Sequence, residues 1–168
     1  MIEIDEYGAE KSENRGTVVV GMSGGVDSSV TALLLKRRGY RVIGANHIIL
    51  PEEENLKSSP LDDIEKLTEF LNIPFLKVNL QDLFSELIIG NFIDTYLKGR
   101  TPNPCVLCNE QIKFGAFIDA AKKRLVKEGF VEREEPVYFS TGHYVRTELF
   151  NNRRYICKGT DPSKDQSY

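Results

Sequence analysis

The chain has 168 residues, 40% of them hydrophobic, and a formal net charge of -3 at neutral pH. This length and composition predict one globular domain, and the acidic balance argues against a protein that binds nucleic acid through its overall charge. The charge is uneven, because residues 98–127 hold seven basic and two acidic side chains. This stretch predicts either a local basic face or only the solvated side of a helix.

The N-terminal residues are polar and mixed in charge, and we expect residues 1–15 to be a flexible leader. They lack the layout of a secretion signal, and no apolar run in the sequence approaches the length of a membrane span. Three cysteines without such a signal favour free thiols or metal ligands over a disulfide framework. We therefore expect a cytoplasmic protein that makes no contact with a membrane.

The first strand-to-helix junction carries the strongest signal. An apolar run at 17–21 predicts a buried strand, and residues 28–38 predict a helix that Gly39 ends. The junction reads Gly21-Met22-Ser23-Gly24-Gly25-Val26-Asp27-Ser28-Ser29. Small residues before a helix let backbone N–H groups and the helix dipole face an anion, so the junction predicts a phosphate site. The alternative is a glycine pair that only turns the chain.

The elements that follow repeat the strand and helix pattern. A strand is predicted at 41–49, followed by a polar loop at 51–60. Residues 61–71 have apolar side chains at helical spacing that should face a sheet, and a short strand follows at 75–80. A further helix is predicted at 82–97.

Residues 99–115 form a second cluster of chemical interest. Two prolines and a C-x-x-C pair, Cys105 and Cys108, precede a helix predicted at 110–127. A helix N-terminus favours the thiolate form, so Cys108 is a candidate nucleophile. Structural zinc would need a second ligand pair at the usual spacing, which the sequence does not supply, and two buried, inert cysteines are the other alternative.

The last core strand is predicted at 137–141. After it, residues 144–149 and 154–158 flank Asn151-Asn152 and predict a small C-terminal β-hairpin. Strands that alternate with helices predict an α/β fold with a doubly wound parallel sheet and helices on both faces. Ligands of such folds bind at the carboxyl ends of the strands, where the glycine junction lies.

The junction sequence Ser-Gly-Gly-Val-Asp-Ser at 23–28 resembles the pyrophosphate loop (PP-loop) of the ATP pyrophosphatases, which cleave ATP between the α and β phosphates and transfer AMP to an oxygen of the substrate. Together with residues 99–115, 140–146 and 159–168, it is similar, in order, to the bacterial tRNA-uridine 2-sulfurtransferases, or tRNA-specific 2-thiouridylases. The resemblance implies an adenine nucleotide alpha hydrolase-like fold. It also implies that ATP adenylates O2 of the wobble uridine of tRNA before sulfur replaces that oxygen.

The resemblance implies ATP and Mg²⁺ as cofactors, and tRNA and a persulfide donor, either a cysteine desulfurase or a relay protein, as partners. It assigns the reactive thiol to Cys108 and the positioning of Mg²⁺ to Asp27. The implied nucleotide contacts are Gly21, Met22, Ser23, Gly24, Gly25, Val26, Asp27, Ser28, Ser29, His47 and Gly142. The implied substrate contacts are Asn103, Pro104, Cys105, His143, Lys164, Asp165 and Gln166.

Two of these assignments have structural alternatives. His47 stands where family members usually carry methionine, and it is either packing or a wall of the nucleotide pocket. His143 is alternatively a histidine at an element end that bonds to backbone.

Cys105 stands where many family members carry aspartate. The cysteine variant resembles a subgroup that holds an iron–sulfur cluster (4Fe–4S) through three cysteines, so the resemblance also makes Cys105 and Cys108 candidate cluster ligands. The fourth iron would be open to bind sulfide, and this sulfide would then replace the persulfide as the sulfur source. The third family cysteine lies beyond residues 164–166. Cys157 is the remaining thiol of the chain, and we expect it to be structural.

We expect a catalytic domain at 16–143, and at 144–168 the hairpin with the start of a truncated linker or following domain, so that the chain is a fragment of a longer protein. Two other functions stay open: another PP-loop ATP pyrophosphatase, such as an amide-forming ligase, and a non-catalytic nucleotide-binding module. The C-x-x-C pair argues against the ligase, because amide formation needs no thiol.

Overall fold

The computed structural model describes residues 15–51 and 60–165. Its centre is a four-stranded parallel sheet with the order β3-β2-β1-β4. The strands are β1 (Thr17–Gly21), β2 (Arg41–Ile48), β3 (Phe75–Asn79) and β4 (Val137–Ser140). All four predicted strands are confirmed. Because the chain returns from β3 to pair β4 with β1, the strand order reverses between these two neighbours, which is where such sheets bind ligands.

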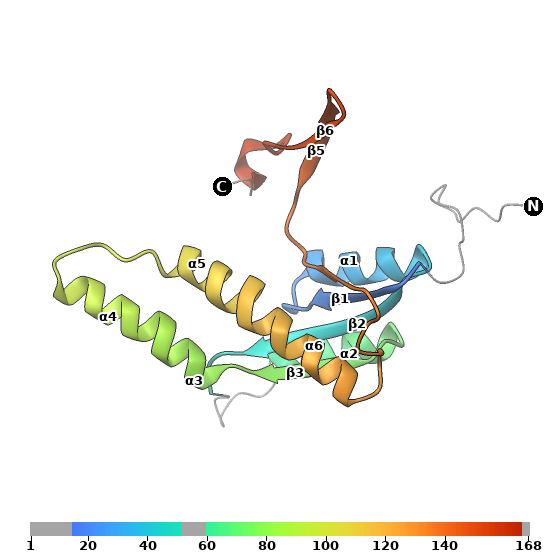
Figure 1. Cartoon of the computed structure of the whole chain (residues 1–168), viewed down its shortest axis with the longest axis horizontal. Coiled ribbons are helices and arrows are strands. Elements are labelled where there is room, and N and C mark those ends of the chain that lie inside the picture. Colours follow the sequence, from blue (N-terminus) through green and yellow to red (C-terminus); the bar gives the residue numbers. More distant parts are fainter. Residues whose placement is uncertain (1–14, 52–59, 166–168) are drawn as a thin grey trace, which may run out of the picture.

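Helices cover both faces of the sheet, as predicted (Figure 1). On one face, α1 (Val26–Arg37) and α2 (Pro60–Phe70) bury Ala32 and Ile64 against Val18 and Val20 of β1. On the other face, α6 (Phe117–Lys127) buries its apolar stripe against β1, β2 and β3. Alternate residues of β1 therefore enter different cores, which explains why its run of valines is buried on both sides.

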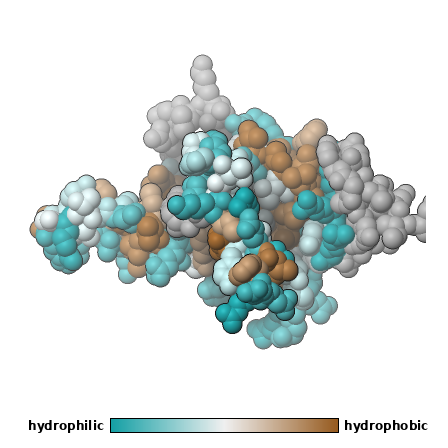
Figure 2. Space-filling model, turned by 90° about the horizontal axis from the view of Figure 1, so that it is seen from above, coloured by the Kyte–Doolittle hydropathy of each residue, from teal (hydrophilic) through white to brown (hydrophobic). Residues whose placement is uncertain are grey.

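Two long helical segments form an arm that extends away from the sheet (Figure 1). The outgoing segment comprises α3 (Gln81–Phe84), the π-helical η1 (Ser85–Ile89) and α4 (Gly90–Leu97). The returning segment comprises α5 (Pro104–Leu107), the π-helical η2 (Cys108–Ala116) and α6. Exposed apolar side chains, including Phe92, Ile93 and Leu97, lie on this arm, and brown atoms are visible behind its hydrophilic tip (Figure 2).

The returning segment corrects one prediction. Its helix begins at Pro104, not at Glu110, so both cysteines of the C-x-x-C pair lie within the helix and not in a loop before it. The physical reason is a cap: the Asn103 side chain accepts a 3.3 Å hydrogen bond from the backbone N–H of Val106. Proline at the first helical position lacks a donor that would be unpaired there anyway.

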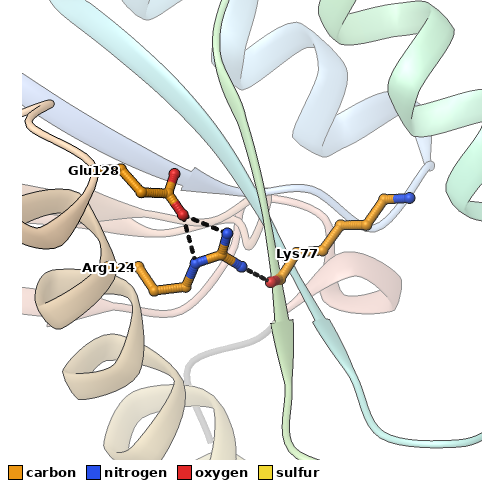
Figure 3. A network of polar contacts seen from close by, with 3 residues as sticks. All are labelled: Lys77, Arg124 and Glu128. Carbon is orange, nitrogen blue, oxygen red and sulfur yellow. Dashed lines mark hydrogen bonds and ion pairs between the residues drawn. The ribbon is translucent and has the colours of Figure 1, made fainter.

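Arg124 fastens α6 to the sheet (Figure 3). Its guanidinium donates to the backbone carbonyl of Lys77 on β3 and, through Nε at 2.8 Å, to the carboxylate of Glu128 one turn later. The Lys77 side chain points away from Arg124, and its Nζ lies 2.7 Å from Glu65 of α2. Arg124 is thus a structural contact between helix and strand rather than a free part of a basic face.

The predicted hairpin is confirmed as β5 (Arg146–Phe150) and β6 (Arg153–Cys157), which project from the sheet (Figure 1). Asn151 and Asn152 turn it with φ angles of 47° and 57°, the left-handed values that a two-residue turn requires. A 3₁₀ turn, η3 (Pro162–Lys164), follows. The described ranges contain no helix long and apolar enough to cross a membrane. Residues 1–14, which hold most of the predicted leader, most of the predicted loop at 51–60, and Gln166 lie outside them.

Candidate active site

The loop between β1 and α1 is shaped by its own serines. The buried hydroxyl of Ser28 accepts from the backbone N–H of Ser23 at 3.2 Å and donates to the carbonyl of Gly25 at 3.1 Å. The Ser29 hydroxyl donates to that same carbonyl at 2.8 Å. Gly24 has φ +79°, a conformation that side chains rarely tolerate. The loop is therefore built as a fixed bend before any ligand arrives.

This bend presents the first turn of α1 to solvent. Gly25 is the N-cap and supplies no side-chain cap to the first turn, while its own N–H donates to the Ser23 hydroxyl at 3.4 Å. Ser23, Gly24, Val26 and Asp27 are exposed. An uncapped helix N-terminus combines unpaired N–H donors with the positive end of the helix dipole, so this surface suits an anion.

A cavity of about 480 Å³ opens beside the bend, at the carboxyl ends of β1, β2 and β4. The predicted nucleotide residues that line it are Gly21, Met22, Ser23, Asp27, Ser28, His47 and Gly142, and the predicted substrate residue His143 joins them. The other predicted nucleotide residues, Gly24, Gly25, Val26 and Ser29, belong to the bend or to the first turn of α1 without lining the cavity. Residues far apart in the sequence thus meet at one place.

Asn46 fixes the start of the bend from the neighbouring strand. Its side-chain amide donates to the carbonyl of Met22 at 2.6 Å, while the backbone N–H of Met22 donates to Ala45 at 2.7 Å. Met22 itself is buried in the core under α1. Both the backbone N–H and the carbonyl of Met22 are therefore hydrogen-bonded to β2. These bonds fix the direction in which the chain leaves β1 and enters the bend.

His47 is part of the cavity wall, and its ring lies 5.2 Å from that of Phe117. Burial lowers the pKa of His47, and the positive charge of Lys113 lowers it further. The imidazole is therefore neutral near pH 7 and offers an aromatic surface with hydrogen-bonding nitrogens rather than a charge. Lys113 and Phe114 also line the cavity, so the basic side chain here comes from η2.

Gly142 closes the cavity next to the start of α1. A Cβ built on Gly142 would stand 2.7 Å from the backbone nitrogen of Ser28 and 2.9 Å from the carbonyl carbon of Asp27. Only glycine lets the segment after β4 approach the helix this closely. Two residues later, the hydroxyl of Tyr144 donates a 2.6 Å hydrogen bond to the carboxylate of Asp27.

A second cavity, of about 570 Å³, adjoins the first beneath the hairpin. The two share a wall made of Phe114, Thr141 and His143. The Thr141 hydroxyl lies 2.8 Å from His143 Nδ1, and the ring of Phe114 lies 6.4 Å from the imidazole. His143 is thus held by a neighbouring side chain and separates two hollows.

The predicted substrate residues divide between this second cavity and the arm. Lys164 and Asp165 line the cavity, and Asp165 also accepts a 2.8 Å hydrogen bond from the backbone N–H of Gly159. Asn103, Pro104 and Cys105 lie instead at the start of α5, where the Asn103 side chain acts as the helix cap. The structure therefore does not bring these two groups together in one pocket.

Cys105 is exposed and Cys108 half-buried, so the alternative of two buried, inert cysteines is wrong. Burial raises the pKa of the Cys108 thiol; the charge of Lys113 opposes this, and Cys105 adds to the rise. The expected stabilisation of a thiolate by the helix N-terminus is therefore not the dominant effect, because Cys108 lies beyond the first turn of a helix that begins at Pro104. Asn109, the next residue, lines the second cavity.

The described ranges hold two of the three cysteines that the iron–sulfur prediction needs, Cys105 and Cys108. Iron–sulfur clusters are held by cysteine thiolates, and the predicted cluster would use three of them. Within residues 15–51 and 60–165 no group of three or more His, Cys, Asp or Glu side chains is arranged to hold a metal ion. Cys157, expected to be structural, is half-buried on β6 and lines the second cavity.

A family model described as tRNA methyl transferase HUP domain matches residues 16–168. The chain belongs to this family. The tRNA-specific 2-thiouridylase MnmA 1 of Clostridium botulinum (strain Okra / Type B1) is 45% identical over 157 residues, covering 92% of this chain and 42% of the relative. MnmA 1 of Caldanaerobacter subterraneus subsp. tengcongensis is 46% identical over 167 residues, covering 93% of this chain and 43% of the relative. The predicted resemblance to the thiouridylases is confirmed, and the chain spans about two fifths of the length of these relatives.

Two solved structures also resemble this HUP domain. The U34-tRNA thiolase NcsA from Methanococcus maripaludis, with its 4Fe–4S cluster, has a TM-score of 0.44 and 23% identity, covering 78% of this chain and 39% of that one. The NH₃-dependent NAD synthetase from Campylobacter jejuni has a TM-score of 0.40 and 22% identity, covering 73% of this chain and 46% of that one.

Among the residues of the HUP domain site that sequence reasoning missed are Asn46, Lys113, Phe114 and Tyr144. Lys113 and Phe114 lie inside the segment 99–115 on which the family resemblance rests. Their place a few residues after Cys108 in that segment was the available signal that they belong to the site. No local signal marks Asn46 or Tyr144, because their partners, Met22 and Asp27, are distant in the sequence.

Proposed function

We propose that the chain is the catalytic domain of an enzyme that thiolates the wobble uridine of tRNA at position 2, with ATP as the activating cosubstrate. One observation carries the proposal: the exposed carboxylate of Asp27 and the uncapped start of α1 face a cavity of about 480 Å³ at the strand-order reversal. The curated relatives are named for this reaction. In this assignment the catalytic domain is residues 16–143.

ATP would lie with its triphosphate on the bend at 23–29 and its base against the apolar wall. Backbone N–H groups of the bend and of the first turn of α1 would bind the β and γ phosphates, which leave as pyrophosphate. The aromatic wall that includes Phe117 and His47 suits a flat adenine base. Lys113 adds a positive charge to the same cavity.

The donor set fits Mg²⁺, which is bound in proteins by one or two carboxylates together with substrate phosphates. Asp27 is an exposed carboxylate at the cavity, next to the anion-binding start of α1. When bound, Mg²⁺ would neutralise charge on the departing pyrophosphate. The protein supplies the position of the carboxylate and the N–H donors that hold the phosphates around it.

The second cavity would receive the uridine, because it shares the wall of Phe114, Thr141 and His143 with the nucleotide cavity. Adenylation requires O2 of the base to contact the α phosphate. Ligands in two adjoining cavities would lie close enough for this contact. Lys164 supplies a cation for the tRNA backbone, with Asp165 beside it. Asn103, Pro104, Cys105 and Gln166 remain proposed contacts with the tRNA.

Sulfur would then displace AMP from C2 of the uridine. We assign the thiol to Cys108, which would receive the outer sulfur of a persulfide from a desulfurase or relay protein. That outer sulfur would attack C2, and AMP would leave with the uridine oxygen. A second thiol would then attack the Cys108 sulfur, so that the S–S bond breaks, a disulfide forms with Cys108 and 2-thiouridine is released. Its half-buried position and raised pKa mean that the free thiol is largely protonated near pH 7, which limits its reaction with other electrophiles. The assignment places the protein in the cytoplasm, where thiols stay reduced.

The nucleotide half of this proposal is tested by isothermal titration of the protein with ATP in the presence of Mg²⁺. We expect Asp27→Ala to weaken binding at least about tenfold, because it removes the metal ligand. Asp119→Ala, an exposed carboxylate on α6, is the matched control and should bind like the wild type. Equal affinities of all three proteins would contradict the assigned site.

The acceptor half is tested by AMP release. We expect unmodified tRNA and sulfide to stimulate release of AMP and pyrophosphate, and mass spectrometry of the digested tRNA to detect 2-thiouridine. ATP binding without any stimulation by tRNA would instead support a non-catalytic nucleotide-binding module.

A further inference from the structure

Tyr144 connects the two cavities. Its side chain lines the cavity beneath the hairpin, while its hydroxyl reaches Asp27 of the nucleotide cavity at 2.6 Å. The two residues come from the segment after β4 and from the first turn of α1, which Gly142 allows to approach each other. The contact thus joins two parts of the chain that approach each other closely at Gly142.

The hydrogen bond has a geometric effect on the carboxylate. An exposed aspartate side chain rotates freely, whereas a charge-assisted hydrogen bond from a phenol hydroxyl fixes one of its oxygens. Tyr144 donates to Oδ1, and an ionised carboxylate has further acceptor sites on both oxygens. The contact therefore orients Asp27 and still leaves it able to bind a cation.

We propose that Tyr144 is a positioning residue, which holds the Asp27 carboxylate in the orientation that Mg²⁺ requires when it binds together with the phosphates of ATP. Carboxylates that bind metal ions are themselves held by hydrogen bonds, and loss of such a partner typically weakens metal binding by about 10–100-fold. This inference rests on the proposed function, since it takes Asp27 as the magnesium ligand. It adds a residue to which neither sequence reasoning nor the family resemblance gave a role.

The contact is poorly suited to a purely structural role. Tyr144 is 51% exposed, and Asp27 is exposed as well, so the hydrogen bond is open to water. Hydrogen bonds in such positions exchange readily with water and add little to stability. A hydrogen bond that orients a carboxylate, in contrast, contributes to the binding of the carboxylate's ligand and not to the stability of the fold.

The test is a magnesium titration of ATP binding in four proteins: wild type, Tyr144→Phe, Tyr155→Phe and Asp27→Asn. The concentration of Mg²⁺ that gives half-maximal ATP binding is the readout, and ATP binding without Mg²⁺ is measured alongside. Tyr144→Phe removes one oxygen and should raise the half-maximal Mg²⁺ concentration at least about tenfold. Its metal-free ATP binding should stay unchanged. Tyr155→Phe, the same change on β6, should behave like the wild type.

A double variant separates positioning from a general effect. If Tyr144 acts through Asp27, adding Tyr144→Phe to Asp27→Asn should cause no further increase in the Mg²⁺ requirement. An unchanged or lower Mg²⁺ requirement in the single Tyr144→Phe variant would overturn the inference while leaving the proposed function intact. Failure of the wild type to bind ATP at any Mg²⁺ concentration would overturn the proposed function, and this inference with it.

Discussion

Gly142 lies so close to Ser28 that a Cβ on the glycine would stand 2.7 Å from the backbone nitrogen of the serine. This approach places the segment after β4 against the N-terminus of α1 and brings His143 to the nucleotide cavity and Tyr144 to Asp27. The two nearest atoms to such a Cβ belong to the backbone of Asp27 and Ser28, so no flexible side chain could move aside to make room for it.

Gly142→Ala should therefore destabilise the fold by about 1–3 kcal/mol, the usual cost of an inserted methyl group that must displace its neighbours. The free energy of unfolding from urea titration is the measurement. Gly21→Ala is the control, because the nearest atoms to a Cβ there are 3.8 Å away and allow ordinary contact. Equal stabilities of the two variants would show that the segment after β4 has room for a methyl group at residue 142.

Lys113 should control the reactivity of Cys108. Its positive charge lowers the pKa of the thiol and so opposes the effect of burial. Lys113→Met should slow alkylation of Cys108 by iodoacetamide at about pH 8, because a smaller fraction of the thiol is ionised. Mass spectrometry of each cysteine peptide follows the reaction, with Cys157 as the internal control. Unaltered alkylation of Cys108 would mean that Lys113 does not influence it.

His47 should make stability depend on pH. Its pKa in the folded protein lies below the ordinary value of 6.5, so the unfolded chain takes up a proton more readily. The contribution of His47 to stability is complete above pH 6.5 and falls as the pH drops towards the lowered pKa of the folded state. Urea titrations between about pH 7.5 and 5 should show a steeper loss in the wild type than in His47→Gln. Parallel curves would contradict the burial of a neutral imidazole.

Arg124→Met should lower the free energy of unfolding by about 1–2 kcal/mol, because the carbonyl of Lys77 loses its charged donor while the apolar stem is kept. The control is Lys127→Met, an exposed lysine in the last turn of the same helix, which should change stability by less than about 0.5 kcal/mol. Thermal unfolding followed by circular dichroism measures both. An unchanged free energy of unfolding in Arg124→Met would contradict a stabilising contact of Arg124 between α6 and β3.

The sheet could be predicted from the sequence because its strands are continuous apolar runs bounded by glycine and polar residues, as Val18 and Val20 in β1 illustrate. The hairpin could be predicted equally well, since consecutive asparagines adopt the positive φ that its turn needs. The start of the returning helix was missed although Asn103 and Pro104 are a good cap and first residue. The π-helical turns of η1 and η2 leave no comparable pattern in side-chain spacing.

The site was predictable as far as its residues are neighbours in the sequence. The bend at 23–29 could be predicted directly, because its glycines and serines lie close together in the sequence, at the junction of a buried strand and a helix. Tyr144 could not, since its bond to Asp27 exists only when β4 pairs beside β1. The raised pKa of Cys108 was also inaccessible, because it follows from burial by side chains that come together only in the fold.

The central claim is that backbone N–H groups of the bend bind the phosphates that ATP releases. Amide resonances of Gly24, Gly25 and Val26, followed by ¹⁵N NMR during titration with ATP and Mg²⁺, test it most directly. We expect these amides to shift with ATP and with pyrophosphate but not with adenosine, while residues of the hairpin stay in place. Shifts confined to residues outside 21–29, with the bend unaffected by pyrophosphate, would contradict the account.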